Sequence, residues 1–363
     1  MPLYDGDGVM ITVLGATGFT GRLVVEELRR RRLPVRLAGR NADKLEALVE
    51  DLGERVPTMV ADVTRPETLP PTLEGTRVLI NCVGPFTDLG EPVVAAAVRQ
   101  GVHYLDTTGE QAFIKLVFDR YGDQARRREI VVAPGAAFEY ALADAAAEVA
   151  GRELEPCEEV IIVYAISGFG ASRGTKKSVL RVMTGEGYLY REGRLVRAGL
   201  GAVRRSVHMP GGQKLVALSF PGGEVIHVPQ HVETRSVIPM MAFSSGRALL
   251  LPLGLSLLRA AMIAPLREWI FRRIEAGPVG PSPETRAATR FTLLVEARRG
   301  EDRRAVIAEG CDPYGLTAVV IVALAAHLLE EGPREVGALS PAMIAGPEAI
   351  IDSTGAAGVR WLR

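Results

Sequence analysis

Short apolar runs alternate with amphipathic segments through the N-terminal part of the chain. Six of these runs are typical of buried strands: 9–14, 35–38, 56–60, 78–83, 104–106 and 130–133. The segments between them have apolar residues at helical spacing and predict helices over 22–32, 41–52, 91–100 and 110–128. Asn41 is a suitable helix cap, and Gly53 and Gly101 stand where helices should end. Strands that alternate with helices predict a parallel, doubly wound sheet, whose ligands bind beyond the carboxyl ends of the strands.

The pattern changes after about Cys157, where short strand-like runs lie between glycine and proline turns. Predicted strands cover 158–166, 188–196, 203–208, 214–220 and 224–228, and a predicted helix covers 175–184. A hairpin is predicted from 289–298 and 302–308, with its turn at 299–301. Closely spaced short strands favour antiparallel pairing, so this part predicts an α+β domain with a mostly antiparallel sheet.

The C-terminal part returns to helical patterns. Residues 314–329 are strongly apolar, and Ser340-Pro341 is typical of the start of a final helix. We therefore expect an α/β protein with a Rossmann-type dinucleotide-binding domain over 1–150, a second α+β domain over 151–312, and C-terminal helices over 313–363 that pack back on the first domain. A chain of 363 residues, of which 47% are hydrophobic and 24% charged, can bury two cores.

The first predicted strand runs directly into a glycine-rich turn. Three glycines follow at intervals of three, just before the first helix. Gly15 permits a tight turn, Gly18 lets backbone N–H groups approach a pyrophosphate, and Gly21 lets the helix lie close to the strand. The spacing differs from G-x-G-x-x-G, so the prediction depends on the surrounding βα alternation. The predicted cofactor-binding residues are Gly15, Ala16, Thr17, Gly18, Phe19, Thr20 and Gly21.

The end of the second strand indicates NADP rather than NAD. NAD enzymes usually place an acidic residue there, on the ribose 2′-OH, but this chain has Arg40. A guanidinium can bind a 2′-phosphate through a fork of charge-assisted hydrogen bonds, although a solvated arginine is the alternative. By their positions at the ends of the second, third and fourth strands, further cofactor-binding residues are predicted at Asn41, Asp62, Val63, Cys82, Val83, Gly84 and Pro85.

Charge and cysteine content narrow the function classes. Lys+Arg and Asp+Glu both number 43 and the basic residues are spread along the chain, so no nucleic-acid partner is expected. The three cysteines are far apart and lack a C-x-x-C, which predicts neither a disulfide framework nor a zinc site. His227 and His231 are four residues apart, but Pro229 disfavours a shared helix, so no metal is expected. No signal-sequence pattern is seen, and we expect a cytoplasmic location.

The segment 248–266 is nearly all apolar but is broken by two prolines and a glycine. These breaks leave it too short to span a membrane. Three interpretations stay open: a buried helix, a wall for a bulky apolar substrate, or a surface that rests on a membrane. The arginines that follow suit anionic headgroups or a helix C-terminus, so peripheral membrane contact through 248–273 is one expectation. A homodimer is also left open.

Several longer motifs are spread over nearly the whole chain. Four lie in the predicted first domain: Gly15–Gly21, Asn81-Cys-Val-Gly-Pro-Phe86, Tyr104-Leu-Asp-Thr-Thr-Gly-Glu110, and Ala133-Pro-Gly135 with Asp144. Three more follow: Gly174-Thr175 with Ser178, Asp312-Pro-Tyr-Gly-Leu-Thr-Ala318, and Gly337-Ala-Leu-Ser-Pro-Ala342 before Gly346. The first set resembles the saccharopine dehydrogenase-like oxidoreductase family, and the second resembles its trans-acting enoyl reductase branch.

The resemblance implies a nicotinamide-dependent oxidoreductase with a Rossmann domain, a mixed second domain, and a C-terminal segment that returns to the first. After the sixth strand the family often shows Gly-Phe-Asp-Ser-x-Pro-Ser-Asp, whereas residues 137–144 of this chain read Ala-Phe-Glu-Tyr-Ala-Leu-Ala-Asp. Because substrate should approach there, the departure disfavours saccharopine or an amino acid. The long apolar segment instead favours a small-molecule substrate that is lipid-like or polyketide-derived.

Hydride transfer usually also requires a proton donor within hydrogen-bond reach of the substrate. No lysine of this chain has a tyrosine four positions before it, so the Tyr-x-x-x-Lys pair of short-chain dehydrogenases is absent. Tyr140 and Tyr314 are the candidate donors, with packing or capping as the alternative for each. Glu110 is a further candidate that can orient the substrate or the cofactor amide, and Ser178 can bind a polar group.

These observations predict an NADP(H)-dependent reductase of a C=C or C=O bond in an apolar substrate. One alternative is a saccharopine-type dehydrogenase or imine reductase that acts on an amino-acid-like compound. Another is a non-catalytic NADP-binding sensor or scaffold, because a fold does not guarantee its chemistry. Turnover of NADPH separates the enzymes from the sensor.

Overall fold

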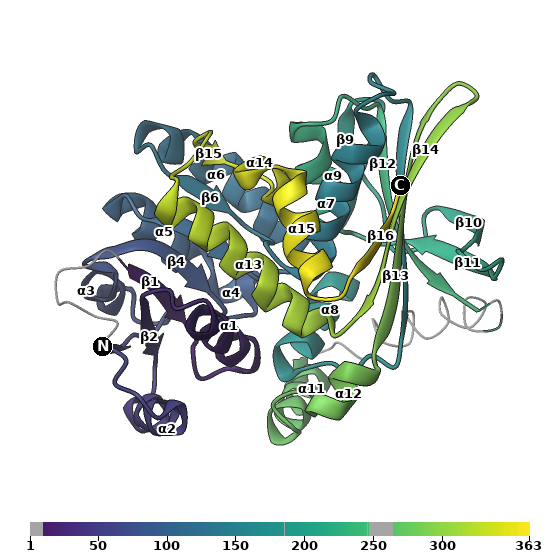
Figure 1. The fold of residues 1–363 in the computed structure, drawn as a ribbon. Helices are drawn as coiled ribbons and strands as arrows, with labels where there is room; N and C mark the ends of the chain where they lie inside the picture. The colour runs from purple at the N-terminus through teal and green to yellow at the C-terminus, as the bar shows by residue number, and fades with distance from the viewer. Residues whose placement is uncertain (1–9, 185, 245, 247–263) are drawn as a thin grey trace. The chain divides into compact units, whose positions relative to one another are not determined.

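The computed structural model describes residues 10–184, 186–244, 246 and 264–363, which form two compact units (Figure 1). Unit 1 contains the described residues up to Thr108, Phe113–Ala141 and Tyr314–Ala357. Unit 2 contains Gly109–Ala112, the described residues of Leu142–Pro313, and Gly358–Arg363. Each unit is therefore assembled from segments that are far apart in the sequence.

Unit 1 is built on a seven-stranded parallel sheet with the strand order β15-β6-β5-β4-β1-β2-β3. Its strands are β1 (Met10–Leu14), β2 (Val35–Gly39), β3 (Thr58–Val60), β4 (Thr76–Asn81), β5 (His103–Asp106), β6 (Val131–Ala133) and β15 (Gly337–Ala338). The order 3-2-1-4-5-6 is that of dinucleotide-binding sheets, in which the strand order reverses between β1 and β4. The predicted Rossmann-type parallel sheet is confirmed.

Helices connect these strands and cover the sheet. They are α1 (Phe19–Arg30), α2 (Ala42–Leu52), η1 (Pro66–Thr68), α3 (Leu69–Leu73), α4 (Phe86–Leu89), α5 (Glu91–Gln100), α6 (Gln111–Arg127), α13 (Pro313–Glu330), α14 (Pro341–Ala345) and α15 (Pro347–Ala356). The helix α7 (Phe138–Gly151) begins in unit 1, and its residues from Leu142 onward belong to unit 2. The side chain of Asn41 accepts a hydrogen bond from the N–H of Lys44, and Gly53 and Gly101 end α2 and α5 in the left-handed conformation. These predicted caps are confirmed.

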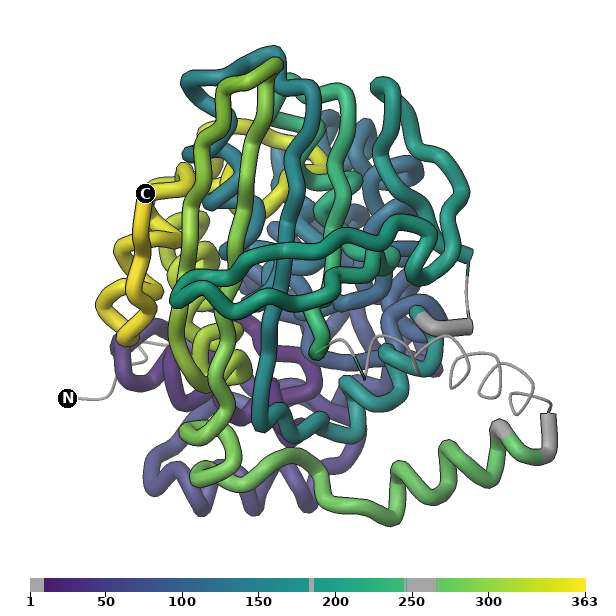
Figure 2. The backbone as a smooth tube through the Cα atoms, turned by 90° about the vertical axis from the view of Figure 1, so that its right-hand side faces the viewer, coloured from purple at the N-terminus to yellow at the C-terminus, as the bar shows by residue number. Residues whose placement is uncertain are grey.

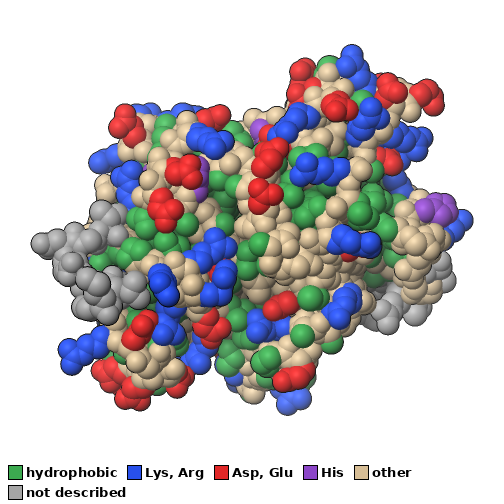
Figure 3. Space-filling model, viewed as in Figure 1, with side chains coloured by type: hydrophobic (Ala, Val, Ile, Leu, Met, Phe, Trp, Pro, Cys, Tyr) green, Lys and Arg blue, Asp and Glu red, His purple; other side chains and the backbone are tan. Residues whose placement is uncertain are grey.

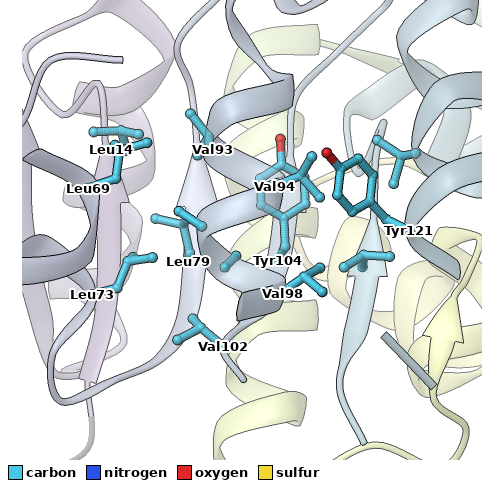
Figure 4. Close-up of a cluster of buried hydrophobic side chains, with 14 of the residues drawn as sticks. Leu14, Leu69, Leu73, Leu79, Val93, Val94, Val98, Val102, Tyr104 and Tyr121 are labelled. Atoms are coloured by element: carbon cyan, nitrogen blue, oxygen red, sulfur yellow. The ribbon is translucent and has the colours of Figure 1, made fainter. Parts of the chain in front are cut away.

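Buried side chains of β1, β4 and β5 form the core of unit 1 with helices on one side of the sheet (Figure 4). Leu14, Leu79 and Tyr104 are at most 1% exposed. They pack in one cluster with residues that include Leu69 of α3 and Val94 of α5. Burying each such side chain stabilises the fold by roughly 1.5–3 kcal/mol. The packed core therefore fixes the strands whose carboxyl ends would bind a ligand.

The helix α13 is long and apolar enough, by length and composition alone, to cross a membrane. However, 61% of its apolar window is buried inside the protein. Leu316, Val320, Leu324 and Leu328 are at most 3% exposed. This burial is typical of a core helix, and the helix contributes to the interior of unit 1.

Unit 2 contains a nine-stranded mixed sheet with the order β10-β11-β12-β7-β13-β14-β16, to which β8 and β9 attach through β12. The strands are β7 (Glu159–Ser167), β8 (Tyr188–Arg191), β9 (Arg194–Arg197), β10 (Arg204–His208), β11 (Lys214–Ser219), β12 (Ser236–Phe243), β13 (Arg290–Arg299), β14 (Asp302–Cys311) and β16 (Arg360–Leu362). β7 and β12 pair in parallel, and the other ladders between these strands are antiparallel. The predicted mostly antiparallel sheet is confirmed.

One face of this sheet is covered by part of the sheet itself. Figure 2 shows the β10–β11 segment crossing over the long strands. Met209 and Leu215 of this segment belong to the same apolar cluster as Ile161 and Val163 of β7. The helical segments of unit 2 are α8 (Arg173–Thr184), α9 (Glu224–His227), η2 (Val228–Gln230), α11 (Ala264–Ala276) and α12 (Pro283–Ala288).

Two strand predictions in unit 2 need correction, and one strand was missed. Residues 224–228, predicted as a strand, form the helix α9 and the start of η2, because a short apolar run does not distinguish the two. Residues 188–196, predicted as one strand, form the β8–β9 hairpin, with Glu192 and Gly193 at positive φ in its turn. The strand β12 was not predicted. The apolar segment 248–266 lies outside the described residues up to 263, and its last three residues begin α11.

Candidate functional site

The glycine-rich turn between β1 and α1 leaves little room for a side chain at any of its three glycines. Gly15 has φ +84°, a conformation that favours glycine. A Cβ added to Gly21 would lie 2.1 Å from the carbonyl oxygen of Gly15, and one added to Gly18 would lie 3.1 Å from the same oxygen. The first turn of α1 therefore packs directly on the backbone of the loop, as the sequence predicts for these three glycines.

The loop presents the N-terminus of α1 at the carboxyl edge of the sheet. The N–H groups of Gly15 and Gly18 are used within the fold, at 2.8 Å from the oxygen of Ala38 and 2.9 Å from that of Gly15. The N–H groups of a first helical turn, such as those of Phe19 and Thr20, have no acceptor within the helix. The first turn of α1 also has no acidic residue. Together with the helix dipole, these features suit a pyrophosphate.

The end of β2 lies beside this loop. A Cβ added to Gly39 would lie 3.7 Å from the hydroxyl oxygen of Thr17. Arg40 follows Gly39 directly, and its side chain is exposed. Asn41 is also exposed and caps α2. The exposed guanidinium thus stands at the position where dinucleotide-binding sheets discriminate between a ribose hydroxyl and a 2′-phosphate.

Asp62 lies two residues after the end of β3, the strand that pairs with β2. Its Oδ1 accepts hydrogen bonds from the hydroxyl and the N–H of Thr64, at 2.7 and 3.0 Å. These bonds lower the pKa of the Asp62 carboxyl, and the charges of Arg65 and Arg40 lower it further. Val63 is 8% exposed and belongs to the core of unit 1. Asp62 is therefore ionised and close enough to Arg40 for their charges to interact.

The segment after β4 packs against the glycine-rich loop. The N–H of Cys82 bonds to the carbonyl oxygen of Leu14 at 2.9 Å, and a Cβ added to Gly15 would lie 2.9 Å from Cγ2 of Val83. Gly84 and Pro85 lead into α4. Burial, with the charge of Asp106, raises the pKa of the Cys82 thiol to about 12, so it stays neutral. A neutral thiol is neither a nucleophile nor a metal ligand.

A hydrogen-bonded network that sequence reasoning missed fixes the loops after β4, β5 and β6. Asn81 donates from Nδ2 to the hydroxyl oxygen of Tyr104 at 3.1 Å, and its Oδ1 accepts from the N–H of Val83 at 3.0 Å. Burial and the nearby Asp106 raise the pKa of Tyr104 well above its ordinary value. The residues lie in the recognised motifs, but their mutual contacts depend on strand pairing, which the sequence pattern does not show.

Asp106 is the centre of this network. It is fully buried, and its Oδ1 accepts hydrogen bonds from the N–H of Thr108 at 2.8 Å and of Gly135 at 2.9 Å. One carboxylate thereby joins the end of β5 to the turn after β6. Its role is to hold backbone in place at the carboxyl edge of the sheet.

The two candidate proton donors are both buried in unit 1. Tyr140 lies in the first turn of α7 and is 2% exposed, and Tyr314 begins α13 and is 8% exposed. The ring of Tyr314 meets that of Phe19 edge to face, with centroids 5.0 Å apart. Thr317, one turn further along α13, accepts a hydrogen bond from the N–H of Phe138 at 3.1 Å. The motif 312–318 thus contacts both the glycine-rich loop and the start of α7.

In unit 2 the structure brings two predicted residues together. Glu110 is 1% exposed, and its Oε1 accepts a hydrogen bond from the hydroxyl of Ser178 of α8 at 2.7 Å. Thr175 instead bonds to Ser172 at the start of α8. Gln111, which sequence reasoning did not select, holds this segment: its amide bonds to the backbone of Tyr188 and to the carbonyl oxygen of Gly222.

Comparison with known proteins identifies the part of the chain that carries the glycine-rich loop. Residues 11–152 match the family described as the saccharopine dehydrogenase NADP binding domain. The resemblance predicted from the motifs is therefore confirmed, and the NADP-binding domain includes all the residues predicted to bind the cofactor.

The relatives match part of this chain rather than the whole. A saccharopine dehydrogenase-like oxidoreductase of Mus musculus is 31% identical over 151 residues, which are 37% of this chain and 35% of the mouse protein. A trans-acting enoyl reductase of Mycobacterium ulcerans is 39% identical over 120 residues, which are 32% of this chain and 29% of that protein. The matches thus span about a third of each relative's length.

A solved structure extends the likeness to the whole fold. Apo histidine-tagged saccharopine dehydrogenase (L-Glu forming) from Saccharomyces cerevisiae covers 98% of this chain and 99% of its own, with a TM-score of 0.60. At 14% sequence identity this similarity shows the fold alone. The part of the chain after residue 152, which includes the nine-stranded sheet, thus also has a counterpart in a solved fold.

Asp144, which belongs to one of the recognised motifs, forms an ion pair inside unit 2. Its Oδ1 lies 2.7 Å from Nε2 of His231, and Glu148 lies 3.5 Å from Nδ1 of the same ring. Burial alone would lower the pKa of His231, but the charge and hydrogen bond of Asp144, with the charge of Glu148, hold it above the ordinary value. In the described part of the chain, no group of three or more His, Cys, Asp or Glu side chains is arranged to hold a metal.

A cavity of about 270 Å³ opens in unit 2 on one face of the nine-stranded sheet. Ile161 and Val163 of β7 line it, together with Leu294 of β13. Side chains alternate between the faces of a strand, so this face is opposite to that of Tyr164, which donates a hydrogen bond to Glu224 at 2.6 Å. The cavity is thus separated by the sheet from the Tyr164–Glu224 pair.

Proposed function

We propose that the protein is an NADP(H)-dependent oxidoreductase that reduces a C=C or C=O bond of an apolar, lipid-like or polyketide-derived substrate. The observation that carries the cofactor assignment is the exposed guanidinium of Arg40, which directly follows β2 beside the glycine-rich loop. A carboxylate at that position would favour a free ribose hydroxyl, whereas arginine favours the 2′-phosphate.

The residues of unit 1 fit this cofactor. The close packing of Gly21 on Gly15 leaves the backbone N–H groups at the start of α1 to bind the pyrophosphate, and Arg40 would bind the 2′-phosphate. When bound, NADPH supplies a hydride from C4 of its nicotinamide. The backbone held by Asn81 and Asp106 would shape the nicotinamide end of the site and keep water from it.

Glu110 and Ser178 are proposed to orient the polar end of the substrate or the cofactor amide. The serine hydroxyl donates to the glutamate, so both side chains offer mainly acceptor oxygens to a ligand. The pair therefore favours an N–H or O–H donor over a carbonyl oxygen.

The proton that completes the reduction is proposed to come from Tyr140 or Tyr314, since a phenol can donate a hydrogen bond to the developing anion. The Tyr314→Phe variant keeps the ring contact with Phe19 and removes only the hydroxyl. A donor's loss would lower kcat about 100-fold or more while NADPH affinity stays unchanged. If neither Tyr140→Phe nor Tyr314→Phe lowers kcat, this part of the proposal is wrong.

The experiment that tests the function is NADPH consumption with a panel of acceptors. The panel contains hydrophobic enones, unsaturated acyl thioesters, long-chain aldehydes, and a 2-oxo acid with an amine. Turnover of an apolar acceptor, reduced in Glu110→Gln and unchanged in Gly355→Ala, is the expected result. Turnover of only the oxo acid and amine would indicate an imine reductase, and tight binding without turnover would indicate a sensor.

A further inference from the structure

Exposed hydrophobic side chains concentrate on one part of unit 2. Eight large hydrophobic side chains are exposed among the described residues, and five of them lie in or next to α8 and α11. These five, which we call the α8–α11 patch, are Phe169, Val179, Leu266, Trp269 and Val279. Trp269 is the most exposed of the eight, at 54%. Single exposed hydrophobics are ordinary, but such a concentration marks an interaction surface.

Local contacts hold the patch together. α8 and α11 pack on each other, and the guanidinium of Arg181 of α8 lies 5.7 Å from the ring centroid of Phe271 of α11. The side chain of Arg173 donates to the carbonyl oxygen of Gly277 at 2.9 Å, and its backbone N–H bonds to Val279. Because Phe271 turns toward α8, the opposite side of α11, with Leu266 and Trp269, is left exposed.

The same two helices are strongly basic in an otherwise neutral protein. They contain seven basic and two acidic residues, whereas the whole chain has a formal net charge of zero. Arg273 places its guanidinium 5.7 Å from the ring centroid of Trp269. Figure 3 shows hydrophobic side chains next to charged ones on the surface over α11 and α12.

We propose that the α8–α11 patch docks the protein on an anionic lipid bilayer, as a peripheral contact. Trp is the residue that suits the bilayer interface, where its ring is buried and its N–H stays hydrated. Neighbouring arginines can extend to the headgroups, as the Arg273–Trp269 pair allows.

The experiment uses the full chain and two kinds of vesicle, phosphatidylcholine alone and phosphatidylcholine mixed with phosphatidylglycerol. The protein is expected to sediment with the mixed vesicles, to bind the neutral ones much less, and to be released by salt. Arg272→Gln is expected to weaken binding about fivefold, the effect of about 1 kcal/mol for one charge near an anionic surface. Trp269→Ser is expected to weaken it at least as much.

A spectroscopic readout and matched controls complete the test. The chain has two tryptophans, so in a Trp361→Phe background the emission of Trp269 should shift to the blue on mixed vesicles. Val196→Ser and Leu362→Ser remove exposed hydrophobics outside the patch and should leave binding unchanged. Absence of vesicle binding, or binding that Trp269→Ser leaves intact, overturns the proposal. A dimer that Trp269→Ser converts to monomer also overturns it, because a second copy would then cover the patch.

Discussion

Cofactor choice depends on one guanidinium. Arg40 is exposed at the end of β2, and the Cβ geometry of Gly39 places the glycine-rich loop next to it. The position of Arg40 could be predicted from the sequence, because the strand before it is a clear apolar run. Its electrostatic interaction with Asp62 could not, because it depends on the pairing of β2 with β3.

We expect Arg40→Ala to weaken NADPH binding about tenfold or more and to leave NADH binding nearly unchanged, since a charge-assisted hydrogen bond is worth about 1.5–3 kcal/mol. Arg55→Ala is the matched control, because Arg55 is exposed in the same unit but precedes β3 rather than following it. The measurement is the change of NADPH and NADH fluorescence on titration. An equal loss for both dinucleotides would refute the role given to Arg40.

A second prediction at this scale compares two glycines of unit 1. In Gly21→Ala the new Cβ meets the oxygen of Gly15, so we expect a loss of stability of about 3 kcal/mol or more and of NADPH binding. In Gly355→Ala nothing lies within 4 Å of the new Cβ in α15, and alanine should stabilise the helix by about 0.5–1 kcal/mol. Thermal unfolding followed by far-ultraviolet circular dichroism measures both. A well-folded Gly21→Ala protein that binds NADPH would show that the close approach of α1 to the loop is not needed for binding.

At the scale of elements, a buried ion pair connects α7 to the segment after η2. Asp144 and Glu148 are one turn apart on α7 and both face His231. The pKa of His231 is raised above its ordinary value of 6.5, so the protonated ring is more stable in the folded protein than in the unfolded chain. The resulting stability is fully present below about pH 6.5 and is lost as pH rises through the folded pKa.

We therefore expect the free energy of unfolding of unit 2 to fall as pH rises above 6.5, and Asp144→Asn to remove most of this dependence. Both tryptophans belong to unit 2, so their fluorescence reports its unfolding by denaturant. His208→Gln is the control, because His208 is exposed. Burial lowers the pKa of His103 to about 4, so the ring takes up a proton more readily in the unfolded chain than in the folded protein. His103 therefore destabilises the fold as pH falls from about 6.5 to 4, below the range in which His231 is tested. A flat pH profile for the wild type would show that the pair contributes nothing.

The elements that the sequence pattern predicted well are those with a clear period or cap. The helix that ends at Gly53 and the β13–β14 hairpin are examples. The strand β12 was missed because it is apolar on both faces and contains Pro239, which disfavours a strand in the absence of tertiary contacts. Its position between β7 and β11 buries it, and such pairing cannot be seen in local periodicity.

At the scale of the molecule, the chain crosses between its two units several times. The C-terminal segment Tyr314–Ala357 belongs to unit 1, where β15 adds a seventh strand beside β6, and the last residues pair with β14 in unit 2. β15 has two residues, too few to give a periodic signal. The parallel sheet could be predicted from repeated βα units. The return of the C-terminal segment to unit 1, and of the last residues to unit 2, depends on long-range strand pairing that local periodicity does not show.

If this fold binds NADPH for hydride transfer, a calorimetric titration of the purified protein with NADPH and, separately, with NADH should show it. We expect one site for NADPH that is at least about tenfold tighter than for NADH, a difference of about 1.4 kcal/mol. Binding of neither dinucleotide, or tighter binding of NADH, would contradict this expectation.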